Sequence, residues 1–293
     1  MAAKDFVSLV ISAILTAGLY AIMSYGLALI YGVMKIINLA HAGVIMLSAY
    51  MTFWLVTTYH VNPFLAPLIV MPTFFLVGLA MQRIFIRPIT GAPPIASLLL
   101  LFGVWLIMQN VAYLIFSGDT RSIFTEYTLL TIKVADIPLS INRLFVFAVG
   151  IVVLVALQLF LSRTYPGRAI RALAADSEAA SLVGINTGRI SMLAFGLGIS
   201  LAALAGSLMS LIYTFDPDFG RSHLLKSFCI VVLGGLESII GVALGSLVLA
   251  LAEALSVVWL RAALQDFVSF ALLVLVLLVL PNGLISLLRG RVH

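Results

Sequence analysis

The chain has 293 residues, of which 63% are hydrophobic and 9% are charged, and its formal net charge is +5. A soluble domain carries about 25% charged residues, so this composition excludes a water-facing globular protein and indicates a polytopic membrane protein. The basic excess fits Lys and Arg in cytoplasmic loops and not nucleic-acid binding, because no basic cluster is present. Cys229 is the only cysteine, so an internal disulfide is excluded, and the four histidines lack metal-ligand spacing.

Apolar segments long enough to cross a bilayer core, which needs about 20 residues, recur along the whole chain. The first is too long for a signal-peptide core and is expected to be retained. We expect spans near residues 6–34, 36–59, 63–86, 95–116, 144–161 and 190–213, and three apolar runs within 224–280. The sequence therefore predicts a single all-α transmembrane domain over residues 1–293, with about nine (8–10) helices, broken or re-entrant segments and one cytoplasmic helix.

The first two predicted spans are joined without a real loop, through a segment that contains Asn38, His41 and Gly43. Unwound backbone at membrane depth is tolerated only beside protein or a water-filled cavity, and transporters place substrate or gating sites at such breaks. These three residues are therefore candidates for a translocation pathway. The alternative is a structural break in which Asn38 and His41 satisfy freed backbone groups.

Residues 118–142 are expected to form an extracytoplasmic loop, because they mix acidic and basic residues with short apolar runs. One interpretation is a lid or an amphipathic hairpin at the membrane interface. The other is a docking surface for an extracytoplasmic partner, to which Asp216, Asp218 and Arg221 of the next outer loop would belong.

Residues 163–189 form the longest polar interruption of the apolar sequence, with four arginines and two acids. Tyr165-Pro166-Gly167 punctuates its start, a helix is predicted over residues 168–183, and Gly184 is a natural C-terminal stop. We place this loop in the cytoplasm, which puts the N-terminus outside and the C-terminus inside. A short surface helix tied to spans at both ends is suited to contact a soluble partner.

Small residues recur at four-residue intervals in two of the later spans. Gly198, Ala202 and Gly206 share one helix face, as do Gly241 and Gly245, and this spacing lets helix backbones approach closely in lipid. The contacts are expected within the chain, or alternatively at a subunit interface.

A second break is predicted at Gly234, Gly235 and Glu237, in the opposite half of the chain from the first. Paired glycine-interrupted segments of this kind point to an internally repeated transporter, so these residues join the pathway candidates. Glu253 lies deeper in its predicted span, either as a snorkelling or paired structural acid or as a pathway residue.

The common signatures of membrane enzymes are absent from the sequence. It contains no GxxxxGK[ST] phosphate loop, no HExxH and no GxSxG, so it does not bind ATP in that way, and an enzyme is not supported. No cofactor or metal site is expected.

Three blocks of sequence together resemble the permeases of branched-chain amino acid ABC importers, of the LivH type. The blocks are residues 26–43, 167–186 and 234–241, they occur in the family's order, and the similarity covers nearly the whole chain. The second block contains Glu178-Ala179-Ala180 and, after three residues, Gly184, which is the core of the general ABC-importer coupling motif.

The resemblance implies a permease subunit in a bacterial inner membrane that has no ATPase site of its own. It implies four kinds of neighbour: a second, LivM-like permease subunit, two cytoplasmic ABC ATPase subunits, an extracytoplasmic substrate-binding protein and membrane lipid. Residues 163–189 would then be the cytoplasmic coupling loop, with its contacts made by Arg168, Arg171, Asp176, Glu178, Ala179, Ala180 and Gly184.

Two alternatives to branched-chain amino acid import stay open at the level of sequence. A permease of the same family could carry urea or short-chain amides. An ion-coupled secondary transporter would need ionisable residues inside the membrane, for which only Glu253, Lys35 and Glu237 qualify.

Overall fold

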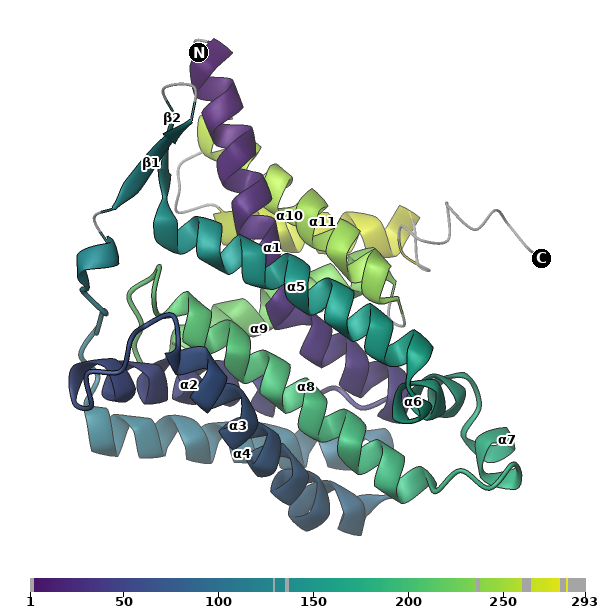
Figure 1. Cartoon of the computed structure of the whole chain (residues 1–293). Helices are drawn as coiled ribbons and strands as arrows, with labels where there is room; N and C mark the ends of the chain where they lie inside the picture. The colour runs from purple at the N-terminus through teal and green to yellow at the C-terminus, as the bar shows by residue number, and fades with distance from the viewer. Residues whose placement is uncertain are drawn as a thin grey trace.

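The computed structural model describes residues 3–128, 130–134, 137–235, 238–259, 265–279 and 283. Long apolar helices run back and forth between two ends of the molecule (Figure 1). The long helices are α1 (Ala3–Met34), α2 (Ala40–Thr57), α3 (Ala66–Met81), α4 (Pro94–Phe116), α5 (Ile141–Arg163), α8 (Thr187–Met209), α9 (Phe219–Gly234), α10 (Ile239–Trp259) and α11 (Gln265–Val279). Two short helices, α6 (Tyr165–Ala175) and α7 (Ser177–Leu182), project between α5 and α8.

Seven helices in the described part are long and apolar enough to cross a membrane. They confirm the predicted all-α polytopic architecture but only part of the predicted count of about nine. The other two candidates, α9 and α11, have 16 and 15 residues. At 1.5 Å per residue, α9 extends about 24 Å, which is less than the roughly 30 Å of a bilayer hydrocarbon core, and both ends of α11 border residues outside the described part.

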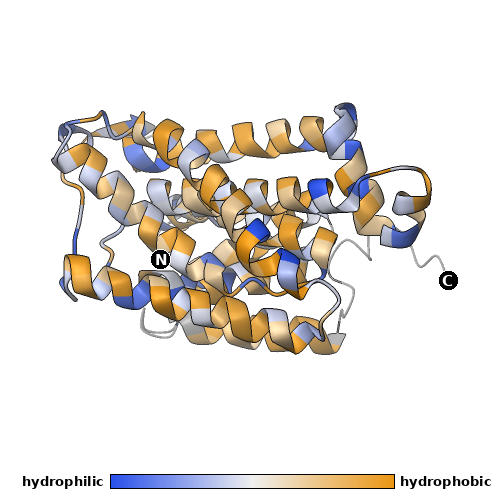
Figure 2. Ribbon diagram, turned by 90° about the horizontal axis from the view of Figure 1, so that it is seen from below, coloured by the Kyte–Doolittle hydropathy of each residue, from blue (hydrophilic) through white to orange (hydrophobic). Residues whose placement is uncertain are grey.

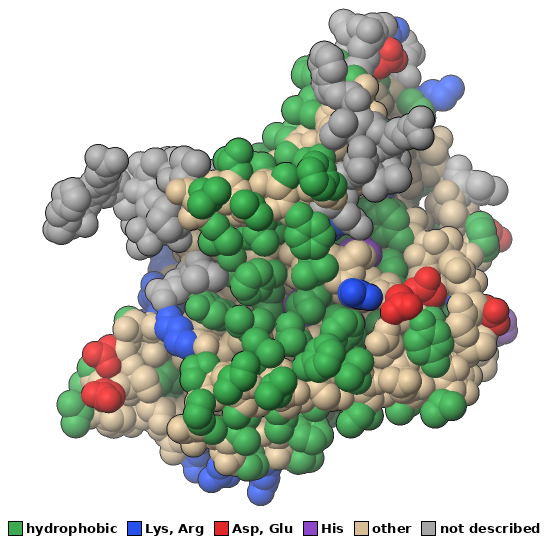
Figure 3. Space-filling view, turned by 180° about the vertical axis from the view of Figure 1, so that it is seen from behind, with side chains coloured by type: hydrophobic (Ala, Val, Ile, Leu, Met, Phe, Trp, Pro, Cys, Tyr) green, Lys and Arg blue, Asp and Glu red, His purple; other side chains and the backbone are tan. Residues whose placement is uncertain are grey.

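Hydropathy along the helices fits this arrangement. The helix bodies are predominantly hydrophobic and the hydrophilic residues gather near the two ends (Figure 2). The space-filling view also shows hydrophobic side chains covering the middle of one face, with most charged side chains toward the edges (Figure 3). A lipid-facing middle band with polar ends is the surface that a bilayer requires.

Helix α8 lies at the centre of the bundle and is the most buried of the seven candidate spans. In an apolar stretch of 18 residues within α8, 83% of the residues are buried, whereas the corresponding stretch of α4 has 17% buried. It packs against α1, α2 and α3, and buried side chains of these helices form one continuous core. The elements that carry the candidate site residues are therefore held against a common central helix.

The loop after α4 contains a hairpin, as one of the interpretations of residues 118–142 expected, within an otherwise helical fold. It contains an antiparallel hairpin, β1 (Thr131–Val134) and β2 (Ile137–Ser140), in which Thr131 pairs with Ser140. Ile137 and Leu139 pack with Leu15 of α1, so the hairpin is tied to the N-terminal half of that helix. Buried and less buried residues alternate along β2, as expected for a strand with one face packed against α1.

The two loops predicted to share an outer surface do meet. The backbone N–H of Arg121 donates to Phe215 O at 2.8 Å, and the N–H of Phe215 donates to Arg121 O at 2.9 Å. In addition, Tyr113 donates a 2.7 Å hydrogen bond to Asp218, which joins the end of α4 to the start of α9.

Candidate functional site

The predicted helix over residues 168–183 is in fact two helices, and this corrects the sequence prediction. The backbone of Asp176 is extended, with φ −156° and ψ 111°. Its Oδ1 accepts hydrogen bonds from the N–H groups of Glu178, at 2.9 Å, and Ala179, at 3.0 Å. Because an aspartate at an N-cap satisfies the free amides of a new helix, it ends α6 and begins α7. The segment is therefore a helix–helix corner.

Both ends of this corner are defined by local sequence. Thr164 accepts a 3.1 Å hydrogen bond from the N–H of Gly167, so α6 begins at Tyr165, earlier than predicted. At the other end, Gly184 has φ +84° and Ile185 N–H donates to Ala180 O at 3.1 Å. This left-handed C-cap confirms the predicted stop at Gly184.

The candidate coupling residues divide into an exposed set and an inward one. Arg168 and Arg171 are exposed on α6, while Ala169, Ile170 and Leu173 bury its opposite face against the core. On α7, Asp176, Glu178 and Ala179 are exposed, as is Gly184 after it, but Ala180 is only 4% exposed and packs into the core. Ala180 therefore lies on the side of α7 that packs against the bundle.

Two large apolar residues that the sequence analysis did not single out dominate the tip of this loop. Leu182 is 87% exposed and Val183 is 77% exposed. The available signal was two adjacent apolar residues directly before a helix-ending glycine in a polar stretch. Exposed apolar side chains bordered by polar residues mark surfaces that contact another protein or the membrane.

The predicted break between the first two spans is present. Helix α1 ends at Met34, α2 begins at Ala40, and Lys35 has φ +54°. The Nε2 atom of His41 lies 2.8 Å from Met23 O, in the middle of α1, so the chain folds back along α1 before α2 starts. The first turn of α2 therefore lies beside the body of α1 and not beyond its end.

Asn38 and His41 are both completely buried at this break. Neither Nδ2 nor Oδ1 of Asn38, nor Nδ1 of His41, has a hydrogen-bond partner in the described part of the chain. The structural alternative, in which the side chains satisfy freed backbone groups, therefore applies to one atom of His41 and not to Asn38. Buried polar atoms without partners are uncommon and mark positions that need a further explanation. Gly43, two residues on, is in close contact with Met108 of α4.

The glycine face of α8 contacts two other helices. A Cβ on Gly198 would lie 2.7 Å from Gly26 O of α1, and one on Gly206 would overlap the backbone of Ile45 on α2. Ala202 lies between them, fully buried. All three residues thus make close contacts within this chain.

The second predicted break shows the same close approach. Gly234 and Gly241 lie backbone against backbone between α9 and α10, and a Cβ on Gly245 would lie 2.7 Å from Ile230 O. Gly235 follows with φ +94°, which ends α9. Glu237 lies outside the described residues.

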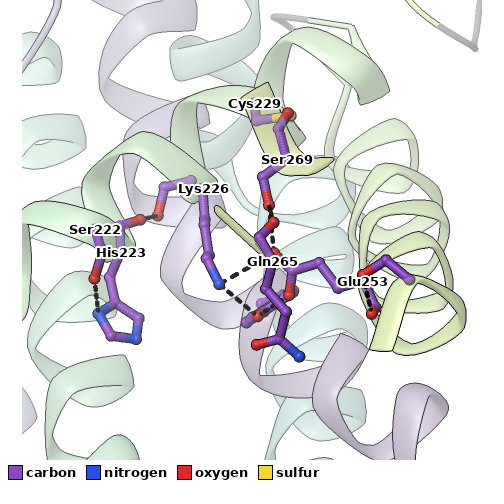
Figure 4. Close-up of polar contacts among 10 residues, drawn as sticks. Ser222, His223, Lys226, Cys229, Glu253, Gln265 and Ser269 are labelled. Carbon is purple, nitrogen blue, oxygen red and sulfur yellow. Dashed lines mark hydrogen bonds and ion pairs between the residues drawn. The ribbon is translucent and has the colours of Figure 1, made fainter. Parts of the chain in front are cut away.

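The second acid considered in the sequence, Glu253, forms a buried polar cluster. Its Oε1 lies 3.1 Å from Nζ of Lys226 and accepts a 2.5 Å hydrogen bond from Ser269, and its Oε2 accepts a 2.5 Å hydrogen bond from Tyr20. Figure 4 shows Lys226 and Ser269 pointing to Glu253 from α9 and α11. Glu253 is therefore paired, as one of the two sequence interpretations expected.

A pocket of about 260 Å³ opens beside this cluster, between α9 and α11. Charged groups of both signs line it together with apolar side chains: Asp218, Arg221, Lys226, Leu225, Cys229 and Phe270 are among its walls. Of these residues, Asp218 and Arg221 are exposed.

The fold and these sites define a multi-pass membrane protein with discontinuous helices and a polar helical corner at one end. The chain belongs to the family of permease components of branched-chain amino acid transport systems, whose family model matches residues 9–277. It is 31% identical over 285 residues to the high-affinity branched-chain amino acid transport permease LivH of Escherichia coli, covering 91% of each chain. It is 32% identical over 283 residues to BraD of Pseudomonas aeruginosa, again covering 91% of each.

A shorter stretch of the chain is similar to a permease that is named for a different substrate. The chain is 34% identical over 116 residues to the fructose import permease FrcC of Rhizobium meliloti, which covers 36% of this chain and 32% of that protein. No solved structure matches the chain.

Proposed function

We propose that the chain is the membrane-spanning permease subunit of a binding-protein-dependent ABC importer for branched-chain or related amino acids. It would act in a bacterial inner membrane, beside a second, LivM-like permease subunit, and would receive substrate from an extracytoplasmic binding protein. Family membership and similarity to LivH and BraD over 91% of the chain support this proposal. The observation that carries the coupling mechanism is the corner between α6 and α7, which places Leu182 and Val183 outward at one end of the bundle.

The corner is suited to transmit force from two separate ATPase subunits. Its outer surface offers the cationic Arg168 and Arg171, the anionic Glu178 and the exposed apolar pair, which together match a groove of mixed polarity. Its inner face, with Ile170, Leu173 and Ala180, is packed into the bundle. Because the inner face is tied to the core, a displacement of the outer face would move α5 and α8 with it.

The translocation pathway is proposed to involve both breaks. Asn38 and His41 have buried polar atoms without partners, which a conformational change could expose to substrate or water. Gly43, Gly234, Gly235 and Glu237 are proposed to line the same route. Gly198, Ala202, Gly206, Gly241 and Gly245 are proposed as the packing contacts about which the helices move.

The pocket between α9 and α11 favours an amino acid over urea or a short amide. A zwitterion carries an ammonium and a carboxylate, for which Asp218 and Arg221 offer opposite charges, and Leu225 and Phe270 suit an aliphatic side chain. An ion-coupled carrier is less well supported, because the intramembrane acid in the described part, Glu253, is already paired with Lys226.

The test is uptake of labelled leucine into proteoliposomes that contain the chain with its partner subunits. Uptake is expected to require internal ATP, both ATPase subunits and the binding protein. Glu178→Arg and Gly184→Val should abolish uptake without reducing membrane insertion. Glu178→Asp keeps the negative charge at the same exposed position and should retain most of the uptake.

Uptake driven by an ion gradient in the absence of the ATPase subunits would overturn the proposal in favour of a secondary transporter. Uptake of urea in preference to leucine, with the same ATP requirement, would correct the substrate alone.

A further inference from the structure

A second polar pocket lies at the same end of the bundle as α6 and α7 and plays no part in the function proposed above. It has a volume of about 320 Å³. Its walls come from two elements far apart in sequence, the first turn of α8 and the end of α3, where a π-helical turn, η1 (Gln82–Ile86), leads into a 3-10 turn, η2 (Arg87–Ile89). The lining residues are Gln82, Arg87, Asn186, Gly188, Arg189 and Met192.

The position of the pocket follows from the packing of α3 on α8. A Cβ on Gly78 would lie 2.9 Å from Cα of Gly196, so the two helices touch at this point. Residues four positions apart share a helix face, and Gln82 and Met192 each lie four positions from these glycines toward the pocket. The close contact therefore continues directly into the pocket wall.

The pocket is strongly cationic. Arg87 and Arg189 both line it, and neither forms an ion pair with a residue in the described part of the chain. The N-terminus of α8 adds partial positive charge from its first free N–H groups. Asn186 Oδ1 accepts from the N–H of Arg189 at 3.0 Å, and Gly188 has no side chain to cover the remaining amides.

Gln82 supplies an independent sign that this pocket binds a ligand. It lines the pocket and is only 4% exposed, yet its carboxamide makes no hydrogen bond with any described residue. The polar atoms of this carboxamide are accessible from the pocket, so they are available to a ligand. Gln82 therefore offers both a donor and an acceptor at the inner wall, beside two arginines.

A phosphate group fits this set of donors. Guanidinium groups match the geometry of phosphate oxygens, and helix N-termini bind phosphate through free backbone amides. Next to the pocket, Ile84 is 61% exposed and Phe85 is 36% exposed, which gives an apolar surface suited to acyl chains. We propose that the pocket binds the phosphate of an anionic lipid headgroup, in the leaflet at the α6–α7 end.

The proposal is tested with the assembled transporter in nanodiscs made from phosphatidylcholine with one-fifth phosphatidylglycerol. Native mass spectrometry counts the phosphatidylglycerol molecules that stay bound after release from the disc. The wild type is expected to retain one more than the Arg87→Gln/Arg189→Gln variant. Gln82→Glu, which puts a negative charge against the phosphate, is expected to lose the same molecule.

Arg83→Gln is the matched control, because Arg83 is exposed on the same turn and does not line the pocket. It should retain the wild-type number of lipids. Arg189→Lys keeps the charge and should retain most of the binding, which separates a lost contact from a misfolded chain. Equal retention by the wild type, the double variant and Gln82→Glu would overturn the proposal.

The source of the phosphate is distinguished in a second arm. The transporter in neutral phosphatidylcholine is titrated with inorganic phosphate, and binding is followed by the rise in melting temperature. A rise that the double variant abolishes, together with no preference for phosphatidylglycerol in the first arm, would replace the lipid with soluble phosphate. If the melting temperature does not rise at phosphate concentrations up to about ten times the physiological level, the result supports the lipid headgroup as the source of the phosphate.

Discussion

The Nζ atom of Lys226 on α9 lies 3.1 Å from Oε1 of Glu253 on α10, and the two side chains are only 12% and 7% exposed. Tyr20 of α1 and Ser269 of α11 donate to the same carboxylate, so four helices meet at one negative charge. A buried ion pair is costly to break from one side, because the remaining charge stays largely desolvated and has lost its counter-ion.

Lys226→Met is therefore expected to destabilise the bundle strongly, by about 3–5 kcal/mol. The double variant Lys226→Met/Glu253→Gln, which leaves no net charge, should recover much of this loss. Melting of the purified chain in detergent measures the effect. Lys133→Met, on the exposed strand β1, is the control; equal melting temperatures for the two lysine variants would show that the ion pair contributes nothing.

Gly206→Ala is expected to destabilise the contact between α8 and α2, because the added methyl group overlaps the backbone of Ile45. Overpacking of this kind costs about 1–3 kcal/mol. Gly103→Ala in α4 has nothing within 4 Å of the new methyl group and should be neutral or slightly stabilising. Thermal unfolding of both variants checks the difference, and similar behaviour would contradict the packing role of Gly206.

Asp176→Ala is expected to impair coupling by loosening α7, with a local loss of about 0.5–2 kcal/mol for the missing N-cap. Asp176→Asn keeps an acceptor oxygen at the cap and should transport nearly normally. ATP-driven leucine uptake and surface expression distinguish the two variants. If Asn fails as badly as Ala, the charge of Asp176 matters more than its capping hydrogen bonds.

Asn38→Leu separates a structural role from a role in transport. Because the Asn38 carboxamide has no partner in the described part, a leucine of similar size should leave the melting temperature unchanged or raise it. Transport should fall if Asn38 lines the pathway. A variant with normal uptake rate and affinity would return this break to a purely structural interpretation.

Much of this fold was predictable from the sequence. Hydrophobic runs of bilayer length placed the long helices to within a few residues, and Gly184 marked the end of α7, because glycine accepts the left-handed conformation at low cost. The four-residue spacing of Gly198, Ala202 and Gly206 likewise predicted one close-packing face.

Other features required the three-dimensional structure. Asp176 lies among good helix formers, so only its extended backbone reveals that it caps a new helix instead of continuing the old one. Lys226 and Glu253 are isolated charges in different spans, and their pairing depends on how α9 and α10 pack. Gln82 and Arg189 line one pocket only because α3 packs against α8, and no local sequence pattern encodes that contact.

The most direct test of the central claim is a cross-link from the tip of α7. Cys229 is the only native cysteine and is buried, so Leu182→Cys introduces a single accessible thiol. Single cysteines are placed along the groove of the co-expressed ATPase subunit, and mild oxidation should then give a disulfide-linked product of the two chains. The control is Phe124→Cys in the opposite loop, which should give no such product. Absence of any product from position 182 at every groove position, in a complex that still transports leucine, would contradict the account.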